Sequence, residues 1–231
     1  MYKAERVGAV IVAAGKSERM NGVDKIYAPL AGKPVIVRTV NIFQTSEFVD
    51  EIVLVVSEAN ISTVNSYIKD EGWKKVTAVV TGGARRQDSV SAGLKAIHDC
   101  PWVVIHDGAR PLMPRGLILS GLLAAEETGS AVAAVPVNDT IKVVDEDMFV
   151  RETPPRRFLR VVQTPQIFRF AIIYKAYLSL EHEVTDDASL VERMGFPVRL
   201  YMGSYDNIKI TTPTDITIAG VLWSKRGSNE L

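Results

Sequence analysis

Three cationic side chains follow a glycine near the start of the chain. Lys16, Arg19 and Lys25 come after Gly15, and Gly15 ends a nearly uninterrupted apolar run, Val7 to Ala14. The glycine lets the backbone turn tightly and come close to a ligand, because no Cβ stands in the way. Cations on a glycine turn at the carboxyl end of a buried strand suit a phosphate-bearing ligand. We therefore predict that this segment is a loop that binds a nucleoside triphosphate.

Two other interpretations of this segment are weaker. Gly15-Lys16-Ser17 imitates the end of a Walker A loop, but that motif needs a glycine where this chain has Val10. Lys3 and Arg6 before a short apolar run faintly resemble a secretory signal, but charged residues resume directly after the run. We expect neither a P-loop nor a signal peptide.

Polar groups also gather at three later places, each at the carboxyl end of an expected strand. These are the segments Gly82–Ser89, Asp107–Arg110 and Lys209–Thr212. Open α/β sheets bind ligands at that edge. With the first loop, the segments offer cations, glycines, a helix N-terminus and one carboxylate. That set fits a nucleotide bound with Mg²⁺, since magnesium prefers one or two carboxylates together with phosphate oxygens.

Asp107 is the best candidate for the magnesium ligand, although its neighbourhood allows other roles. Asp107 could stabilise the turn that follows it, and Arg110 could merely pair with Asp107. Arg85 and Arg86 as a pair are more often surface charge, so we assign only one of them to phosphate binding. We expect His106 to satisfy a local hydrogen bond rather than to take part in chemistry.

Apolar segments without polar alternation recur along the chain, and such segments indicate strands covered on both faces. Helical patterns lie between them. Strands are expected at residues 7–14, 51–57, 76–81, 102–106 and 130–137, and helices at 35–44, 59–71, from about 87, and at 114–128. The regular alternation predicts an α/β fold with right-handed crossovers and a doubly wound, mostly parallel, Rossmann-like sheet. We expect a single domain over residues 1–231.

The alternation stops after Val137. Residues 141–144 and 148–153, on either side of the acidic segment Asp145–Asp147, predict a β-hairpin. Because such a hairpin cannot bury itself alone, we expect residues 138–160 to form a protruding arm that packs against a second subunit. Later strands are expected at residues 159–163, 198–202 and 208–211, and later helices at 171–180, 186–194 and 213–225.

The bulk composition excludes several classes of protein. The chain has 231 residues, 27 basic and 27 acidic side chains, and 47% hydrophobic residues, enough for a sizeable core. Zero net charge argues against a nucleic-acid or membrane partner, and no apolar run reaches membrane-spanning length. Cys100 is the one cysteine, so an internal disulfide and a cysteine-rich metal site are excluded. We expect a cytoplasmic protein in which Cys100 is a buried thiol.

Seven motifs, taken in order, carry a more specific signal. They are residues 13–20 (AAGKSERM) with Lys25, 82–90 (GGARRQDSV), 106–111 (HDGARP), 136–142 (PVNDTIK), 163–166 (QTPQ), 185–188 (TDDA) and 207–211 (NIKIT). Their order and content resemble the 2-C-methyl-D-erythritol 4-phosphate cytidylyltransferase family of the nucleotidyltransferase superfamily. The resemblance runs from about residue 7 to residue 220, and it implies a sheet of the nucleotide-diphospho-sugar transferase type.

The resemblance also implies partners and residue roles. The substrates would be CTP and a polyol phosphate of the non-mevalonate isoprenoid pathway, the cofactor Mg²⁺, and the assembly a homodimer held by the arm. Implied for catalysis and triphosphate binding are Arg19, Lys25 and Lys209. Implied around the nucleotide are Ala13, Ala14, Gly15, Gly82, Gly83 and Ser89. Implied for the acceptor side are Asp107 (also the metal ligand), Arg110, Thr140, Arg156, Thr164 and Thr185, of which Thr140 and Arg156 would serve the partner's site.

Some positions depart from the family pattern. Ser17 stands where a second loop glycine is frequent, and Gly108 replaces a common alanine. Arg157 could take the role given to Arg156, and Thr185 could be a helix N-cap instead of a substrate ligand. None of these departures removes a charge that the chemistry needs.

The chemistry agrees with the residue set, since an ionised phosphate monoester can attack the α-phosphorus of CTP without a protein base. Cations and Mg²⁺ would stabilise the transition state electrostatically. Three alternatives stay open: ribitol-5-phosphate cytidylyltransferase, a non-catalytic nucleotide-binding regulator on the same fold, and, more distantly, a P-loop ATPase or kinase.

Overall fold

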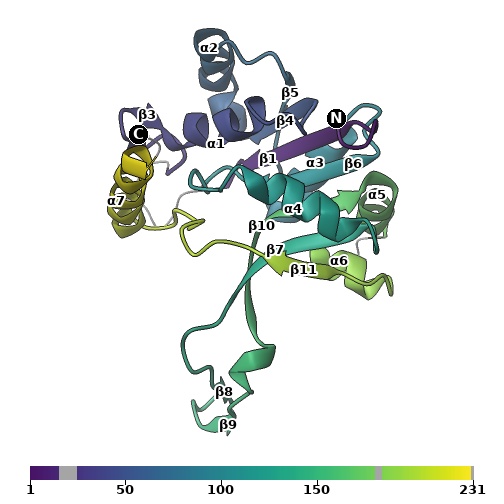
Figure 1. The fold of residues 1–231 in the computed structure, drawn as a ribbon, viewed down its shortest axis with the longest axis vertical. Helices are drawn as coiled ribbons and strands as arrows, with labels where there is room; N and C mark the ends of the chain where they lie inside the picture. The colour runs from purple at the N-terminus through teal and green to yellow at the C-terminus, as the bar shows by residue number, and fades with distance from the viewer. Residues whose placement is uncertain (16–24, 180–183, 230–231) are drawn as a thin grey trace.

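The computed structural model describes residues 1–15, 25–179 and 184–229, and its main element is a seven-stranded sheet (Figure 1). The strand order is β11-β7-β10-β6-β1-β4-β5. All neighbouring strands run parallel except at β10, which is antiparallel to both β6 and β7. The strands are β1 Val7–Ala13, β4 Glu51–Val56, β5 Val76–Thr81, β6 Trp102–Asp107, β7 Ser130–Pro136, β10 Arg160–Arg169 and β11 Arg199–Met202. The predicted mostly parallel α/β sheet is confirmed.

Helices cover both faces of this sheet, and alternate side chains of β1 show why. Ala9 and Ile11 point into one core with residues of α1, α2 and α4, whereas Val10 points into a second core with residues of α3, α5 and α6. The strand is therefore apolar at every position rather than at every second one. The helices are α1 Val35–Gln44, α2 Ile61–Glu71, α3 Arg86–Lys95, α4 Gly116–Ala125, α5 Phe170–Leu178, α6 Ala188–Arg193 and α7 Pro213–Asn229.

The strand expected at residues 208–211 is wrong. This segment is a loop without regular secondary structure, and Ile210 attaches it to the core. The Ile210 backbone N–H donates to the carbonyl of Ala109 at 2.9 Å, and its side chain is fully buried beside Leu30 and Leu112. The buried Ile210 side chain, its backbone bond and the hydrogen bonds of Thr211 to Asp215 thus hold this segment without a strand ladder.

The expected hairpin forms an arm that extends away from the sheet (Figure 1). Within it β8 Val143–Val144 pairs antiparallel with β9 Val150–Glu152, so its strands are shorter than predicted. Large apolar side chains at its tip and base face outward: Met148 is 75% exposed and Phe158 is 73% exposed. Among the described residues, no helix combines the length and apolarity needed to cross a membrane.

Candidate active site

The parallel strands of the sheet centre end together at one edge. Val12 is the Cα partner of Asp107, and Val56 is the partner of both Ala13 and Thr81. The polar segments that follow these strands are consequently neighbours in space. Two hollows open at this edge of the sheet.

The first hollow, called here the glycine-side hollow, has a volume of about 180 Å³. Most of the residues implied for the nucleotide line it. Its walls are Val12, Ala13, Ala14, Gly15, Lys25, Ile26, Gly83, Ala84, Arg85, Arg86, Ser89, Asp107, Ala109 and Lys209. Arg19, implied for the triphosphate, lies outside the described residues.

Gly82 stands behind this hollow, and its lack of a side chain is what allows two walls to meet. A Cβ on Gly82 would come within 2.3 Å of the Ala14 Cβ and 2.6 Å of the Ser89 Oγ. The Ser89 hydroxyl in turn accepts a hydrogen bond from the Gly83 N–H at 3.2 Å. The glycine pair therefore packs the first strand against the start of α3.

The N-terminus of α3 is closed by its own residues. The Asp88 carboxylate accepts a hydrogen bond from the Arg85 backbone N–H at 3.1 Å and pairs with the Arg85 guanidinium at 2.7 Å. The Arg85 side chain holds the pKa of Asp88 below its ordinary value. Asp88 therefore caps this helix and also fixes the direction of Arg85.

The second hollow, called here the acceptor-side hollow, has a volume of about 480 Å³ and lies next to the first. Its walls are Arg86, Asp107, Arg110, Val162, Gln163, Thr164, Gln166, Thr185, Asp186, Ser189, Glu192 and Lys209. Arg86, Asp107 and Lys209 line both hollows. Two ligands bound here would therefore meet across one carboxylate and two cations.

Asp107 is the charge centre of this shared wall. Its Oδ2 lies 3.1 Å from Lys209 Nζ and 3.2 Å from Arg110 Nε, and its Oδ1 lies 3.4 Å from Arg86 Nε. Burial alone would raise the pKa of Asp107, but Lys209, Arg86 and Arg110 together hold it well below its ordinary value. The carboxylate is ionised, and the pairing of Arg110 with Asp107 is observed.

His106 has the local role expected of it. Its side chain is fully buried, with Nδ1 3.0 Å from the Thr164 hydroxyl and Nε2 3.2 Å from the Arg110 carbonyl. The same Thr164 hydroxyl accepts a hydrogen bond from the Asp107 N–H at 3.0 Å. Burial lowers the pKa of His106 to about 4, so the ring is neutral near pH 7. His106 thus orients Thr164, which lines the acceptor-side hollow.

The side chains around Asp107 fit a magnesium ion only if a bound substrate supplies further oxygen ligands to the ion. In the part of the chain that the structure describes, no group of three or more His, Cys, Asp or Glu side chains could hold a metal. Mg²⁺, however, commonly binds one or two carboxylates plus substrate phosphates. Asp107 with phosphate oxygens from the glycine-side hollow meets that requirement.

Arg86 is the functional residue that the sequence analysis placed least well. An Arg-Arg pair in a sequence indicates mainly surface charge, yet Arg86 is paired with the buried Asp187 and lines both hollows. The signal available in the sequence was Asp187 in the segment 185–188, but only the fold brings it to Arg86. Thr185 lines the acceptor-side hollow, whereas the N-cap position of α6 belongs to Asp187, so the N-cap role considered for Thr185 is wrong.

Two other candidates lie elsewhere in this chain. Thr140 and Arg156 are exposed residues of the arm and line neither hollow. The Arg156 guanidinium donates to the carbonyl of Asn138, at the base of the arm. Figure 1 shows the arm leading away from the sheet, and neither side chain lines a hollow of its own chain.

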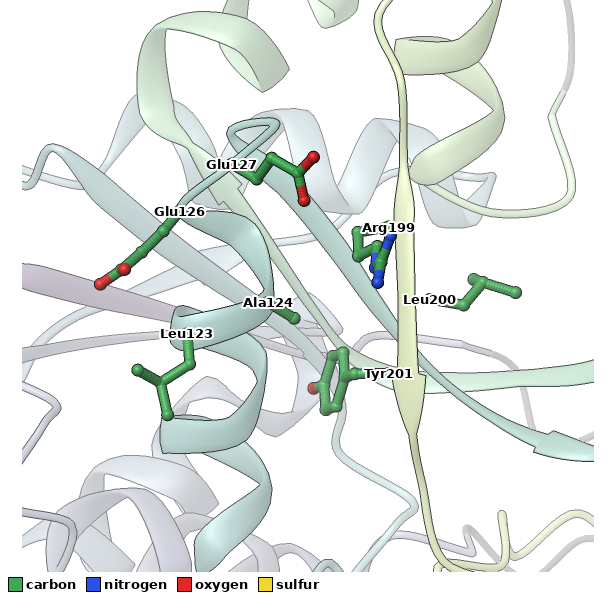
Figure 2. Close-up of a pocket in the computed structure, with 7 residues that line it drawn as sticks. All are labelled: Leu123, Ala124, Glu126, Glu127, Arg199, Leu200 and Tyr201. Carbon is green, nitrogen blue, oxygen red and sulfur yellow. The ribbon is translucent and has the colours of Figure 1, made fainter.

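A further surface hollow lies at the opposite edge of the sheet, between α4 and β11 (Figure 2). Arg199, on its wall, is the Cα partner of Ala131 near the start of β7, which places the hollow at the amino ends of the parallel strands. Glu126, Glu127 and Tyr201 also line it. It is therefore separate from the site at the carboxyl edge.

Comparisons with known proteins agree with one another. The family model described as "IspD: 2-C-methyl-D-erythritol 4-phosphate cytidylyltransferase" matches residues 7–225. A curated protein of that name from Dehalococcoides mccartyi is 52% identical over 225 residues, covering 97% of this chain and 99% of the relative. Another, from Caldanaerobacter subterraneus subsp. tengcongensis, is 44% identical and covers 95% of this chain and 99% of the relative.

Solved structures show the same similarity. The 4-diphosphocytidyl-2C-methyl-D-erythritol synthase of Anaerococcus prevotii superposes with a TM-score of 0.86 at 32% identity, covering 95% of this chain and 96% of that one. The 2-C-methyl-D-erythritol 4-phosphate cytidylyltransferase of Thermus thermophilus gives a TM-score of 0.76 at 32% identity, covering 94% and 98%.

Proposed function

The chain belongs to the 2-C-methyl-D-erythritol 4-phosphate cytidylyltransferase family, and from this premise we propose how its site carries out the reaction of that family. The chain is a nucleotidyltransferase that joins CTP to 2-C-methyl-D-erythritol 4-phosphate in isoprenoid biosynthesis, with release of pyrophosphate. The phosphate monoester of the acceptor attacks the α-phosphorus of CTP in line. One P–O bond forms, and the bond to the β-phosphate oxygen breaks.

The observation that supports this proposal most strongly is the wall shared by the two hollows. CTP in the glycine-side hollow and the acceptor in the acceptor-side hollow would bring their phosphates together beside Arg86, Asp107 and Lys209. The barrier to the reaction is the approach of two anions and the crowding of charge in the transition state. Preorganised cations in a partly dry site stabilise that charge without needing to reorganise. The acceptor phosphate is already ionised near pH 7, so no protein base is required.

The places of individual residues support the following proposed roles. Lys25 lines the glycine-side hollow and would bind the triphosphate together with Arg19. Ala13, Ala14, Gly15, Gly83 and Ser89 would surround the nucleotide, with Gly82 behind them.

On the other side, Arg110, Thr164 and Thr185 would bind the acceptor, and Lys209 would contact both substrates. Asp107 would hold Mg²⁺ together with phosphate oxygens of the nucleotide. The ion supplies positive charge that stabilises the transition state and the departing pyrophosphate.

We further propose that two copies of the chain form a homodimer through their arms. The exposed apolar side chains of the arm, among them Met148, Phe149 and Phe158, leave a surface that a second copy could cover. Thr140 and Arg156 would then reach the acceptor-side hollow of the partner, with Arg157 as the alternative to Arg156. This arrangement would explain why these side chains do not line the hollows of their own chain.

Pyrophosphate release measured with each of the four nucleoside triphosphates and several polyol phosphates tests the proposal. We expect turnover with CTP and 2-C-methyl-D-erythritol 4-phosphate and little with the other combinations. Exclusive use of ribitol 5-phosphate would reject the acceptor. CTP binding without any pyrophosphate release would favour a regulator, and ATP hydrolysis without an acceptor would indicate an ATPase.

A further inference from the structure

Arg86 is held at the shared wall by a carboxylate that lies behind the site. Its Nη1 and Nη2 atoms lie 2.9 Å and 2.7 Å from the two oxygens of Asp187, a bidentate pair. Asp187 is fully buried, and its Oδ1 also accepts a hydrogen bond from the Tyr177 hydroxyl at 2.6 Å. Two parallel bonds fix both the position and the plane of a guanidinium.

The pair also joins the two hollows. Arg86 is the first residue of α3, whose N-terminal turn lines the glycine-side hollow, and Asp187 directly follows Thr185 and Asp186 in the acceptor-side hollow. Gln87, the next residue of α3, makes a second bond to the same segment. Its buried side chain accepts a hydrogen bond from the Val184 N–H at 3.1 Å. The start of α3 therefore holds the segment that carries the acceptor-side residues.

The far side of that segment is fixed as well. The Gln166 amide donates to Asp186 Oδ2 at 2.9 Å, and its oxygen accepts from the Ala188 N–H at 3.1 Å. Residues 184–188 are thus bonded to α3, α5 and β10. Asp186 of this segment lines the acceptor-side hollow directly, whereas Asp187 acts on the shared wall through Arg86.

Neighbouring charges keep Arg86 protonated and the Tyr177 hydroxyl in its donor form. Burial would lower the pKa of Arg86, but Asp187 and Asp107 reverse that effect and raise it. Burial and the Asp187 charge raise the pKa of the Tyr177 hydroxyl, so Tyr177 stays protonated and remains a donor to Asp187. With both Nη atoms held by Asp187, Arg86 Nε faces Asp107.

We propose that Asp187, itself held by Tyr177, is a positioning residue that fixes Arg86 at the wall between the two substrates and so sets the geometry of the transfer. This inference rests on the proposed function. It adds two residues, Asp187 and Tyr177, that touch neither hollow and act through Arg86. Since a displacement of about 1 Å in a reacting geometry can cost about 10²-fold in rate, removal of this support has a measurable effect.

The test compares Asp187→Asn, Arg86→Gln and the double variant with the unaltered chain, by initial rates of pyrophosphate release from CTP and 2-C-methyl-D-erythritol 4-phosphate. We expect Asp187→Asn to lower kcat/KM by about 10- to 100-fold. Arg86→Gln should lower it at least as much. The double variant should be no worse than Arg86→Gln alone, because Asp187 acts only through Arg86.

Two further variants separate positioning from folding. Glu5→Gln removes one partner of a more exposed Arg–carboxylate pair, Arg169–Glu5 with N···O 2.7 Å, at the amino edge of the sheet, and kcat/KM should stay within twofold of the unaltered chain. Tyr177→Phe keeps the Asp187 charge and removes one hydrogen bond, and we expect about a 3- to 10-fold loss of kcat/KM. Tyr177→Phe decides the question if Asp187→Asn does not fold, and thermal unfolding of every variant identifies that case.

Three results would overturn the inference. They are near-normal kcat/KM in Asp187→Asn (or in Tyr177→Phe, if Asp187→Asn does not fold), losses that multiply in the double variant, and a loss in Glu5→Gln as large as that in Asp187→Asn. If the unaltered chain releases no pyrophosphate, the proposed function fails and this inference fails with it. If the unaltered chain is active and the variants are equally active, only this inference fails.

Discussion

Lys209 Nζ lies 3.1 Å from Asp107 Oδ2, although Lys209 belongs to a loop and Asp107 to the end of a central strand. Ile210, the residue after Lys209, holds this loop against the strand. Its N–H donates to the carbonyl of Ala109, two residues beyond Asp107. A cation on a separate segment is thereby fixed at the wall between the two hollows.

Lys209→Ala should lower kcat/KM by about 10²–10³-fold, the scale for losing one preorganised group that stabilises transition-state charge. Steady-state pyrophosphate release measures it. Lys225→Ala, on α7 and outside both hollows, is the matched control and should behave as the unaltered chain. Equal rates for the two variants would remove Lys209 from the mechanism.

Lys25→Ala should lower turnover by about 10²–10³-fold for the same reason, since Lys25 faces the glycine-side hollow. The effect should appear with saturating acceptor and should include weaker CTP binding, which calorimetric titration with CTP can measure. Near-normal turnover would refute the role of Lys25 at the triphosphate.

Asp107→Asn should raise the Mg²⁺ concentration needed for half-maximal rate by at least about tenfold, because an amide is a poor magnesium ligand. Rates over a magnesium titration at fixed CTP provide the measurement. An unchanged magnesium dependence would place the ion on other groups, such as the phosphates alone.

The neutral, buried His106 predicts a dependence of stability on pH. Its folded pKa is about 4, below the ordinary value of 6.5, so between these values the unfolded chain binds a proton that the folded chain does not. Stability therefore falls as the pH falls from 6.5 to 4, by about 3 kcal/mol from this group.

Urea unfolding at several pH values should show that slope in the unaltered chain and a smaller one in His106→Asn. Asp107 contributes in a different pH range. Its pKa is lowered in the folded chain, so the stability that it provides is lost only below pH 3.8, the ordinary pKa of an aspartate. A slope between pH 6.5 and 4 that is equal in both proteins would contradict the assignment to His106.

Mixing two inactive variants tests whether the arm serves the partner. If Arg156 acts on the neighbouring subunit, Lys25→Ala and Arg156→Ala chains mixed in equal amounts should recover about a quarter of full activity, since half of random dimers hold one complete site of two. Subunit exchange followed by the pyrophosphate assay measures this recovery. No recovery, despite dimers in sedimentation analysis, would place Arg156 in its own chain's function or in none.

Much of the fold could be predicted because its strands are buried on both faces. β1 and β4 are apolar at consecutive positions, which distinguishes them from the amphipathic helices around them. Glycine is also the residue expected just after a helix end, and α2 ends at Gly72 with a φ of +65°. The position of the glycine-side hollow could be predicted as well, because the carboxyl ends of parallel strands lie at one edge of the sheet.

The errors have physical causes. The segment 208–211 alternates like a strand, but its pattern does not show whether a ladder or a single buried side chain holds it. Arg86 looked like surface charge because its partner, Asp187, is distant in sequence and is brought near only by the packing of α5 and α6 against α3. Burial of a charge pair depends on tertiary contacts that local patterns do not contain.

The antiparallel course of β10 has one more consequence. The arm leaves the sheet after Pro136 and returns at Arg160, which are Cα partners, and Pro136 ends a strand parallel to the one that ends at Asp107. The arm is therefore rooted at the reacting edge of the molecule. A root at the opposite edge would let assembly and chemistry vary independently of each other. Here, if the proposed dimer forms, a substitution at the root of the arm would affect both assembly and catalysis, and dilution of the protein would lower its activity.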